Sequence, residues 1–446
     1  MEGKSERVRQ EETPMQNVCH HPTRGLVGGT LGFFVGFAAV ALFGPSAKRF
    51  QEVMQLSPFL LGLLIAAPNL SGSLLRIPFG AWVDSTGGRK PFLVLLLASI
   101  VGMAGLTWFV FSRYPDGLTA GHYGFLFFLG MLSGCGIATF SVGIGHVSYW
   151  FPQAQQGLAL GVYAGLGNVA PGLFSFLLPF SMEAWGLSGS YLAWLIFLGV
   201  GTGAYFFIGC NAPYFQYRAQ GLAEEEATAL ARAAGQELFP RGNARQTLAT
   251  AARNWKTWAL TAIYFTSFGG FLALTAWLPT YWTAFQALPL KTAGLLTAFY
   301  SLSCSLSRVA GGKFADRIGG ERALRLSLLT MGLGAMLMTL AQGVGLAVAA
   351  EFILALGMGV GNAAVFKLVP QEIEEAVGGA AGWVGGLGAF GGFALPPVMG
   401  LFVKAFGPSG YALGFSVFLA LAAGSLGLGL LVQRSQRAFP LEPAGN

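Results

Sequence analysis

The sequence predicts an all-helical membrane protein whose twelve transmembrane helices form two halves of six. Three observations predict it: a composition with few charges, twelve apolar stretches of membrane-spanning length, and an internal repeat that relates the two halves. Of the 446 residues, 54% are hydrophobic and only 10% are charged, against roughly 25% in a soluble domain. So few charges would not cover the surface of a globular protein, which argues against a soluble enzyme.

Charge and cysteine usage narrow the function classes further. The net charge is +7, but the basic residues form no patch with interleaved aromatic residues, so no nucleic-acid partner is expected. No two cysteines have the spacing of a metal or redox site, and we interpret them as packing residues: Cys19, Cys135, Cys210 and Cys304. The sequence also has no nucleophile–base pair and no cofactor loop. We therefore expect no enzyme, no cofactor and no metal.

A helix needs about 20 mostly apolar residues to cross a bilayer. The twelve stretches that meet this requirement are residues 25–47, 58–83, 91–112, 121–149, 156–180, 189–210, 256–284, 291–315, 323–342, 344–369, 378–405 and 409–433. One long polar segment separates the sixth stretch from the seventh. The expected organisation is a tail (1–24), a six-helix bundle (25–211), a linker (212–255), a second six-helix bundle (256–433) and a second tail (434–446).

The distribution of Lys and Arg predicts the orientation in the membrane. If both termini and the linker are cytoplasmic, 18 of the 26 basic residues lie on that side and 5 on the other. Cytoplasmic loops carry an excess of Lys and Arg in membrane proteins. We therefore expect a multi-pass protein of the cell membrane, the inner membrane of a bacterium, with both termini in the cytoplasm.

An internal repeat connects the two halves at an offset of 232 residues. Five residues in and just after the second stretch coincide with five in and just after the eighth: Arg76, Gly80, Asp84, Gly87 and Gly88 with Arg308, Gly312, Asp316, Gly319 and Gly320. A weaker repeat at offset 225 relates residues 134–138 to residues 359–363. In repeat transporters the substrate binds near the middle of the membrane, at the interface of the halves.

Arg76 and Arg308 are unusual because both are charged residues within apolar stretches. Each precedes its loop aspartate by eight residues, which places it about 12 Å deeper in the membrane. No acidic residue is expected at that depth, and an unpaired arginine there is costly. We infer that the substrate is an anion, since a guanidinium fork can bind a planar oxyanion through two hydrogen bonds. The alternative is that backbone carbonyls or Tyr hydroxyls pair with the arginines.

The loop from Gly80 to Lys90 and its copy near Gly312 to Arg322 resemble the signature of the major facilitator superfamily. Within that superfamily the chain is similar to the nitrate/nitrite porter family over nearly its whole length. The stretches that carry this resemblance are Gly134–Phe140 running to Pro152, Gly157–Asn168, Gly359–Phe366 and Gly382–Pro396. The resemblance implies the major facilitator fold, with two halves related by a pseudo-twofold axis.

The resemblance also implies which residues form the site. The two arginines would clamp the anion, and further groups would line it: Asn168, Tyr264, Phe37, Phe140 and Phe268. Gating or conformational roles are expected for Asp84, Arg89, Asp316, Gly167 and Gly388. The implied function is transport of nitrate and nitrite in nitrate assimilation. It would proceed by alternating access, in a protein that works as a monomer in the lipid bilayer.

Two coupling schemes remain open. In exchange, the empty site with two unpaired arginines resists closing, so nitrate enters as nitrite leaves. In proton symport, an ionisable group must change its charge, and the candidates are Lys367, His146 and Glu351, which is expected in the outer third of the tenth stretch. Lys367 is otherwise expected to pair with the acidic run Glu372, Glu374 and Glu375, and His146 is otherwise a helix-end histidine. The lack of an acidic residue at mid-depth favours exchange. A uniporter or sensor for another small monovalent anion is a further alternative.

Overall fold

The computed structural model describes residues 18–240 and 244–438, and the regular elements in these two ranges are all helices. The all-helical fold class is therefore confirmed. Parts of both expected tails, residues 1–17 and 439–446, lie outside the described residues, as do residues 241–243 of the linker.

Several membrane spans consist of two helical segments that follow each other with a break between them. The first half contains α1 (Pro22–Phe37), η1 (Ala38–Ala41), α2 (Ala47–Met54), α3 (Pro58–Leu74), α4 (Arg76–Thr86), α5 (Arg89–Arg113), η2 (Ala120–His122), α6 (Tyr123–Ser133), η3 (Gly134–Ala138), α7 (Thr139–Trp150), α8 (Gln153–Gly167) and α9 (Val169–Ile208). The linker contains α10 (Pro213–Ala219), α11 (Glu224–Ala233) and α12 (Ala244–Arg253). The second half contains α13 (Trp255–Tyr264), η4 (Phe265–Gly269), α14 (Gly270–Ala284), α15 (Leu290–Ile318), α16 (Gly320–Leu340), α17 (Val344–Glu372), η5 (Glu374–Ala376), α18 (Val377–Ala389), α19 (Gly391–Phe406), η6 (Gly407–Ser409), α20 (Gly410–Leu413) and α21 (Ser416–Ala438).

Ten helical runs of the described residues are long and apolar enough to cross a membrane. One of these runs, Leu158–Ile208, contains Gly186 with φ 68°, where the helix turns back, so it makes two crossings. The 29-residue helix α15 is not among the ten, yet it packs inside the bundle between other long helices. The described part of the chain therefore agrees with twelve spans.

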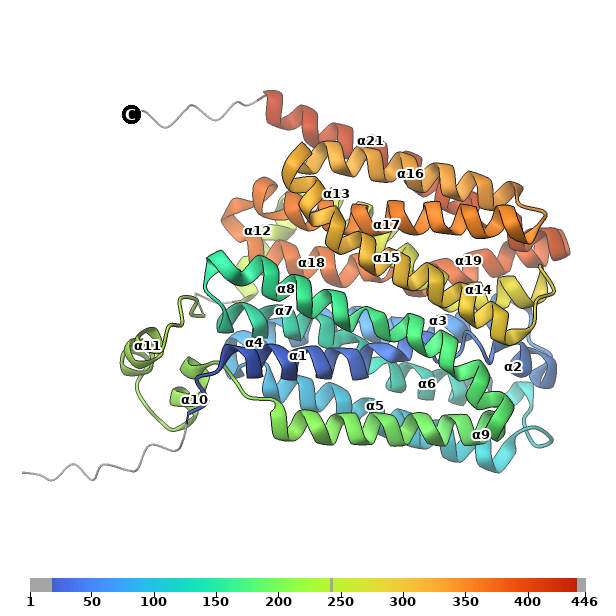
Figure 1. Ribbon diagram of the computed structural model, residues 1–446, viewed down its shortest axis with the longest axis horizontal. Helices are drawn as coiled ribbons and strands as arrows, with labels where there is room; N and C mark the ends of the chain where they lie inside the picture. The colour runs from blue at the N-terminus through green and yellow to red at the C-terminus, as the bar shows by residue number, and fades with distance from the viewer. Residues whose placement is uncertain (1–17, 241–243, 439–446) are drawn as a thin grey trace, which may run out of the picture.

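The long helices run side by side along one direction (Figure 1). The beginning of α1, the end of α21 and the linker helices α10, α11 and α12 lie at one end of the bundle, which we call the termini end. The opposite end, which carries α2, is called the far end. Both Gly87 (φ 72°) and Gly319 (φ 90°) end a helix at the termini end in a conformation that glycine adopts without strain. This explains why the repeat keeps these two glycines in register.

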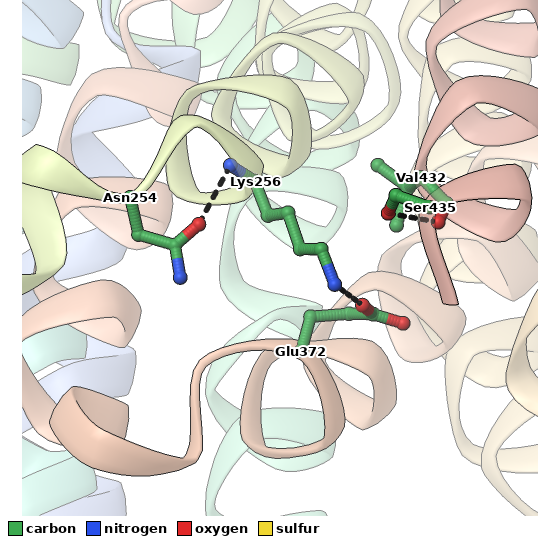
Figure 2. A network of polar contacts seen from close by, with 5 residues as sticks. All are labelled: Asn254, Lys256, Glu372, Val432 and Ser435. Carbon is green, nitrogen blue, oxygen red and sulfur yellow. Dashed lines mark hydrogen bonds and ion pairs between the residues drawn. The ribbon is translucent and has the colours of Figure 1, made fainter. Parts of the chain in front are cut away.

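An ion pair joins two helices of the second half at the termini end (Figure 2). Lys256 Nζ in the first turn of α13 lies 2.8 Å from Glu372 Oε2, at the last residue of α17. The Glu372 side chain is fully buried, so removal of the lysine would leave a buried charge without this partner. Asn254 caps α13 by accepting a hydrogen bond from the Lys256 backbone N–H at 3.0 Å. The beginning of α13 is thereby fixed to the end of α17.

The two halves pack most closely at the far end. A Cβ atom added at Gly62 of α3 would lie 2.5 Å from Pro396 O of α19, and one added at Gly294 of α15 would lie 2.5 Å from Ser175 O of α9. Such distances mean that the backbones of the two halves touch there. At Gly161 of α8 and Gly312 of α15, nearer the termini end, an added Cβ would meet nothing within 4 Å. The two halves are thus in close contact at the far end of the bundle.

Candidate functional site

Breaks in the membrane helices gather at one level of the bundle. The second span breaks at Leu75, between α3 and α4, and the fifth breaks at Asn168, between α8 and α9. The 3₁₀ turn η3 interrupts the fourth span, and the π-helical turn η4 interrupts the seventh. Breaks of this kind inside long helices are frequent at functional sites.

Arg76 is the first residue after such a break, and its side chain is 1% exposed. Its Nη1 donates a hydrogen bond of 3.1 Å to Gly385 O in α18 of the other half. Its Nε and Nη2 are buried and have no hydrogen-bond partner among the described residues. A carbonyl thus satisfies part of this guanidinium, as the structural alternative proposed, but two of its nitrogens are left without a partner.

Arg308 comes from the continuous helix α15 of the second half and is half-buried. Its Nη1 likewise has no hydrogen-bond partner in the described part of the chain. The four ion pairs seen among the described residues involve neither Arg76 nor Arg308. Two positive groups from different halves therefore retain unfilled donors that favour an anionic ligand.

Two aromatic rings contact both guanidinium groups. Phe140 of α7 and Phe268 of η4 are stacked, with 5.8 Å between their ring centroids. The Cζ atom of Arg76 lies 4.8 Å from the Phe140 centroid and 5.1 Å from that of Phe268, and the Cζ atom of Arg308 lies at 5.6 and 5.5 Å. Each half contributes one arginine and one phenylalanine, and cation–π attraction offsets part of the cost of burying two like charges.

Two polar groups adjoin this cluster. The Tyr264 ring stacks on Phe268 at 4.9 Å, and its hydroxyl lies near the Arg308 guanidinium without making a hydrogen bond of normal geometry. Asn168, at the break between α8 and α9, is 2% exposed, and its Oδ1 has no partner among the described residues. The Tyr264 hydroxyl therefore lies where an anion held by the arginines could meet a further donor, and the Asn168 carbonyl accepts a hydrogen bond of 3.3 Å from Ser305, three residues before Arg308.

Two rings, those of Phe33 and Phe140, separate Phe37 from the arginines. Its ring contacts Phe33 at 4.7 Å, and Phe33 contacts Phe140 at 5.3 Å. Gly167 and Gly388 provide space for rings of the site: an added Cβ at Gly388 would lie 2.6 Å from Tyr264 Cδ1, and one at Gly167 would overlap the Phe33 ring. Their place beside the rings gives a physical reason for glycine at both positions.

Sequence reasoning did not assign two groups that contact the arginines. One is the Gly385 carbonyl, which accepts the Arg76 hydrogen bond. The other is Phe366 of α17, whose ring centroid lies 5.9 Å from Arg308 Cζ and 5.0 Å from the Tyr264 ring. Phe366 follows the repeat counterpart of Phe140 by one residue, so the weaker repeat was a signal that could have found it. Nothing in the sequence marks one glycine carbonyl among 66 glycines.

The gating candidates of the first half have partners at the termini end. Asp84 Oδ1 accepts a hydrogen bond of 2.8 Å from the Tyr149 hydroxyl. The Arg89 backbone N–H donates to Asn211 Oδ1 at 2.9 Å, and the Arg89 guanidinium donates to Phe206 O at 2.9 Å. Asp84 and Arg89 thus join the loop after α4 to α7 and to the end of the sixth span.

The second half uses an ion pair instead. Lys367 Nζ lies 2.6 Å from Asp316 Oδ1 and donates to Ala315 O at 2.9 Å. The expectation that Lys367 pairs with the acidic run after α17 is therefore wrong, because the lysine points across to α15. Glu372 of that run instead binds Lys256.

His146 is not at an exposed helix end. Its side chain is 1% exposed and its ring packs edge-on against Phe92 and Trp150. The free thiols of Cys19 and Cys210, which are far apart in the sequence and are interpreted from it as packing residues, lie 3.2 Å apart. The Gln216 side chain brings them together by binding both the N–H and the C=O of Cys19, each at 2.9 Å.

Comparison with known proteins identifies the family of the chain. The family profile described as Major Facilitator Superfamily matches residues 29–396 and 285–444. The chain is 33% identical over 388 residues to the probable nitrate/nitrite antiporter NarK1 of Thermus thermophilus, which covers 83% of this chain and 82% of that protein. It is 32% identical over 368 residues to the probable nitrate/nitrite transporter NarK2 of Mycobacterium tuberculosis, covering 82% and 85%. The chain belongs to the nitrate/nitrite porter family of the major facilitator superfamily.

A third relative of this porter family is the nitrite extrusion protein of Bacillus subtilis, 28% identical over 396 residues, covering 89% of this chain and 91% of that one. Among solved structures, the xylose transporter XylE from E. coli in a partially occluded inward open conformation matches with a TM-score of 0.70. It is 14% identical, and the match covers 96% of this chain and 100% of that chain. This likeness confirms the major facilitator fold.

Proposed function

We propose that this porter carries nitrate and nitrite across the cell membrane, exchanging one for the other. The observation that carries the proposal is the pair of guanidinium groups, one from each half, with unfilled donors beside two stacked rings. The names of the relatives indicate that the anions are nitrate and nitrite. The proposal assigns no catalytic step and no cofactor to the chain.

The chemistry of the site favours a small, planar, monovalent anion. Each guanidinium offers a planar fork that suits two oxygens of one plane. The rings of Phe140 and Phe268 replace water around the anion, which disfavours strongly hydrated ions such as sulfate and phosphate. The Tyr264 hydroxyl completes the site as a donor, the Asn168 side-chain amide adjoins it, and Phe37 supports the rings from behind.

Exchange follows from the charge of the site. The two arginines repel each other when the site is empty, and the Arg76 bond to Gly385 satisfies only one of their donors. An anion that bridges both groups would draw the halves together and allow the carrier to reorient. Reorientation of the loaded carrier alone gives one-for-one exchange. Asp84, Arg89 and Asp316 would hold the termini end in its alternative positions through the contacts described above.

We place the termini end in the cytoplasm, in accordance with its excess of basic residues. The conformation in which the halves are in close contact at the far end is then the one that faces the cytoplasm. The site uses residues of a single chain, so we propose that the monomer is the functional unit.

The test is nitrate uptake into proteoliposomes that contain the purified protein, with or without nitrite inside. The proposal predicts fast uptake into nitrite-loaded vesicles and at least tenfold slower uptake into empty vesicles at equal pH on both sides. Vesicles with Arg308→Ala protein serve as the control for leakage. Equal uptake with and without internal nitrite would contradict exchange, and no nitrate flux from folded protein would contradict the substrate assignment.

A further inference from the structure

A second ionisable group lies inside the membrane part of the second half, away from the arginines. Glu351 of α17 is 0% exposed, and neither of its carboxyl oxygens makes a hydrogen bond of normal geometry with the described residues. It also takes part in none of the four ion pairs seen among them. An ionisable residue within a membrane span is costly and is a candidate functional group for that reason.

The groups around Glu351 are aromatic and uncharged. The Trp282 indole of α14 lies beside the carboxyl. Tyr281 of α14 and Tyr300 of α15 lie nearby. The Tyr281 hydroxyl accepts a hydrogen bond from Gln286, and the Tyr300 hydroxyl contacts Met358 Sδ. The neighbouring segment of α16 is apolar, with Gly334 packed against Leu354 of α17. An isolated carboxylate in such surroundings is strongly disfavoured, so ionisation of Glu351 needs a compensating positive charge within reach.

Packing alone does not require an acid at this position. The repeat at offset 225 aligns Glu351 with Leu126 of the first half, which is also 0% exposed. The first half therefore fills the corresponding position with an apolar side chain of similar size. Since Leu serves the fold there, the carboxyl of the second half needs another explanation.

Glu351 is close enough to the arginine site to respond to its charge. A Cβ added at Gly359 of α17 would lie 3.0 Å from the Arg308 backbone nitrogen, so these two residues are level. Glu351 precedes Gly359 by eight residues and lies about 12 Å towards the far end. A row of rings fills the space between: Phe268 contacts Phe271 at 5.8 Å, and Phe271 stacks on Tyr300 at 6.2 Å.

We propose that Glu351 is a proton-binding site whose occupancy is linked to that of the anion site. The carrier with an anion and a neutral Glu351 has the same net charge as the empty carrier with an ionised Glu351, because the carboxylate replaces the charge of the departed anion. Binding of one proton with each anion gives the empty carrier a way to reorient. The porter thus has a second mode, uptake of an anion with a proton, beside exchange.

This inference rests on the proposed anion transport, and linkage makes it measurable in the purified protein. A bound anion favours the protonated carboxyl, so the proton must favour the anion to the same extent. The dissociation constant of nitrate, measured by calorimetric titration between pH 5 and pH 9, is expected to rise with pH. At pH values where Glu351 of the empty carrier is ionised, the rise should approach tenfold per pH unit. In Glu351→Gln protein the nitrate affinity is expected to be independent of pH.

Glu351→Leu introduces the side chain that the first half has at the corresponding position. Comparison of Glu351→Leu with Glu351→Gln tests whether both variants fold. Glu183→Gln is the matched control, because Glu183 is an exposed carboxyl that pairs with Lys291 at 2.5 Å. It should keep the wild-type pH dependence. In vesicles without nitrite, an inward proton gradient should accelerate nitrate uptake by the wild type but not by Glu351→Gln, while nitrate/nitrite exchange by both stays within about twofold.

Different outcomes contradict different claims. Nitrate binding by the wild type that does not vary with pH would overturn the role of Glu351 and leave the arginine site intact. The same pH dependence in Glu351→Gln would place the proton elsewhere, for example on His146, and would also overturn it. Absence of nitrate binding at every pH would defeat the proposed function and this inference together. An infrared band of a protonated carboxyl that appears in the wild type when nitrate binds, and is missing in Glu351→Gln, tests the bound proton directly.

Discussion

Arg76 and Arg308 occupy the same position of the internal repeat, yet the structure holds them differently. Arg76 begins a helix after a break, is almost completely buried and is bonded to Gly385 of the opposite half. Arg308 lies inside an unbroken 29-residue helix, is half-buried and is held by rings alone among the contacts described. The difference teaches that a symmetric repeat can form an asymmetric site, in which one arginine also joins the two halves.

Among substitutions that keep the charge of the site, the largest effect is expected from changing the shape of the cation. Lysine at position 76 or 308 loses the planar fork, and hydrogen bonds to charged groups contribute about 1.5–3 kcal/mol. The affinity for nitrate should fall roughly 10- to 100-fold in either variant. Arg76→Lys should show the larger loss, because it also changes the bond to Gly385. Titration of the purified variants with nitrate measures both losses of affinity. If Arg76→Lys protein binds nitrate as tightly as the wild type, the planar fork is not used.

Glycines beside the rings should come next in effect. Gly388→Ala would place a Cβ 2.6 Å from the Tyr264 ring, and overpacking of this kind costs about 1–3 kcal/mol. We expect the nitrate affinity to fall about five- to 100-fold because Tyr264 and Phe268 are displaced together. Gly378→Ala in the same helix is the control, since an added Cβ there meets nothing within 4 Å. If both variants bind nitrate equally, Tyr264 does not contribute to the site.

The same comparison can be made in the first half. Gly167→Ala would push Phe33, the ring that links Phe37 with Phe140, whereas Gly161→Ala in α8 adds a methyl group in open space. We expect Gly167→Ala to lower the rate of nitrate/nitrite exchange by a smaller factor than Gly388→Ala, because Phe33 does not touch the arginines directly. The exchange rate in proteoliposomes, measured for all four variants at equal protein density, checks this order.

The smallest effects are expected at the termini end. The Lys367–Asp316 pair is partly exposed, with side chains 24% and 73% accessible, so it contributes about 0–1 kcal/mol. Lys367→Met should change the exchange rate by less than about fivefold, and the difference from wild type should shrink at high salt. Tyr149→Phe removes the hydrogen bond that the uncharged Tyr149 hydroxyl donates to Asp84 in the first half. This variant should show no such salt dependence. A salt response in Tyr149→Phe equal to that in Lys367→Met would refute this distinction between the halves.

The sequence predicts the fold well because bilayer thickness constrains the length of each apolar stretch, and the repeat identifies Arg76 and Arg308 without any contact information. It does not predict that Gly385 O accepts from Arg76 or that Lys367 reaches Asp316, because both contacts depend on how helices distant in sequence are rotated and tilted. The proximity of Cys19 and Cys210 likewise depends on the path of the segment before α1.

The central claim, that one anion is held by an arginine from each half, is tested most directly by equilibrium binding. Nitrate would be titrated calorimetrically into purified wild-type protein and into the Arg76→Ala and Arg308→Ala variants, each shown to be folded by its thermal transition. The account predicts one nitrate per wild-type chain and no measurable binding in either variant. Wild-type affinity in either alanine variant would contradict a site shared between the two halves.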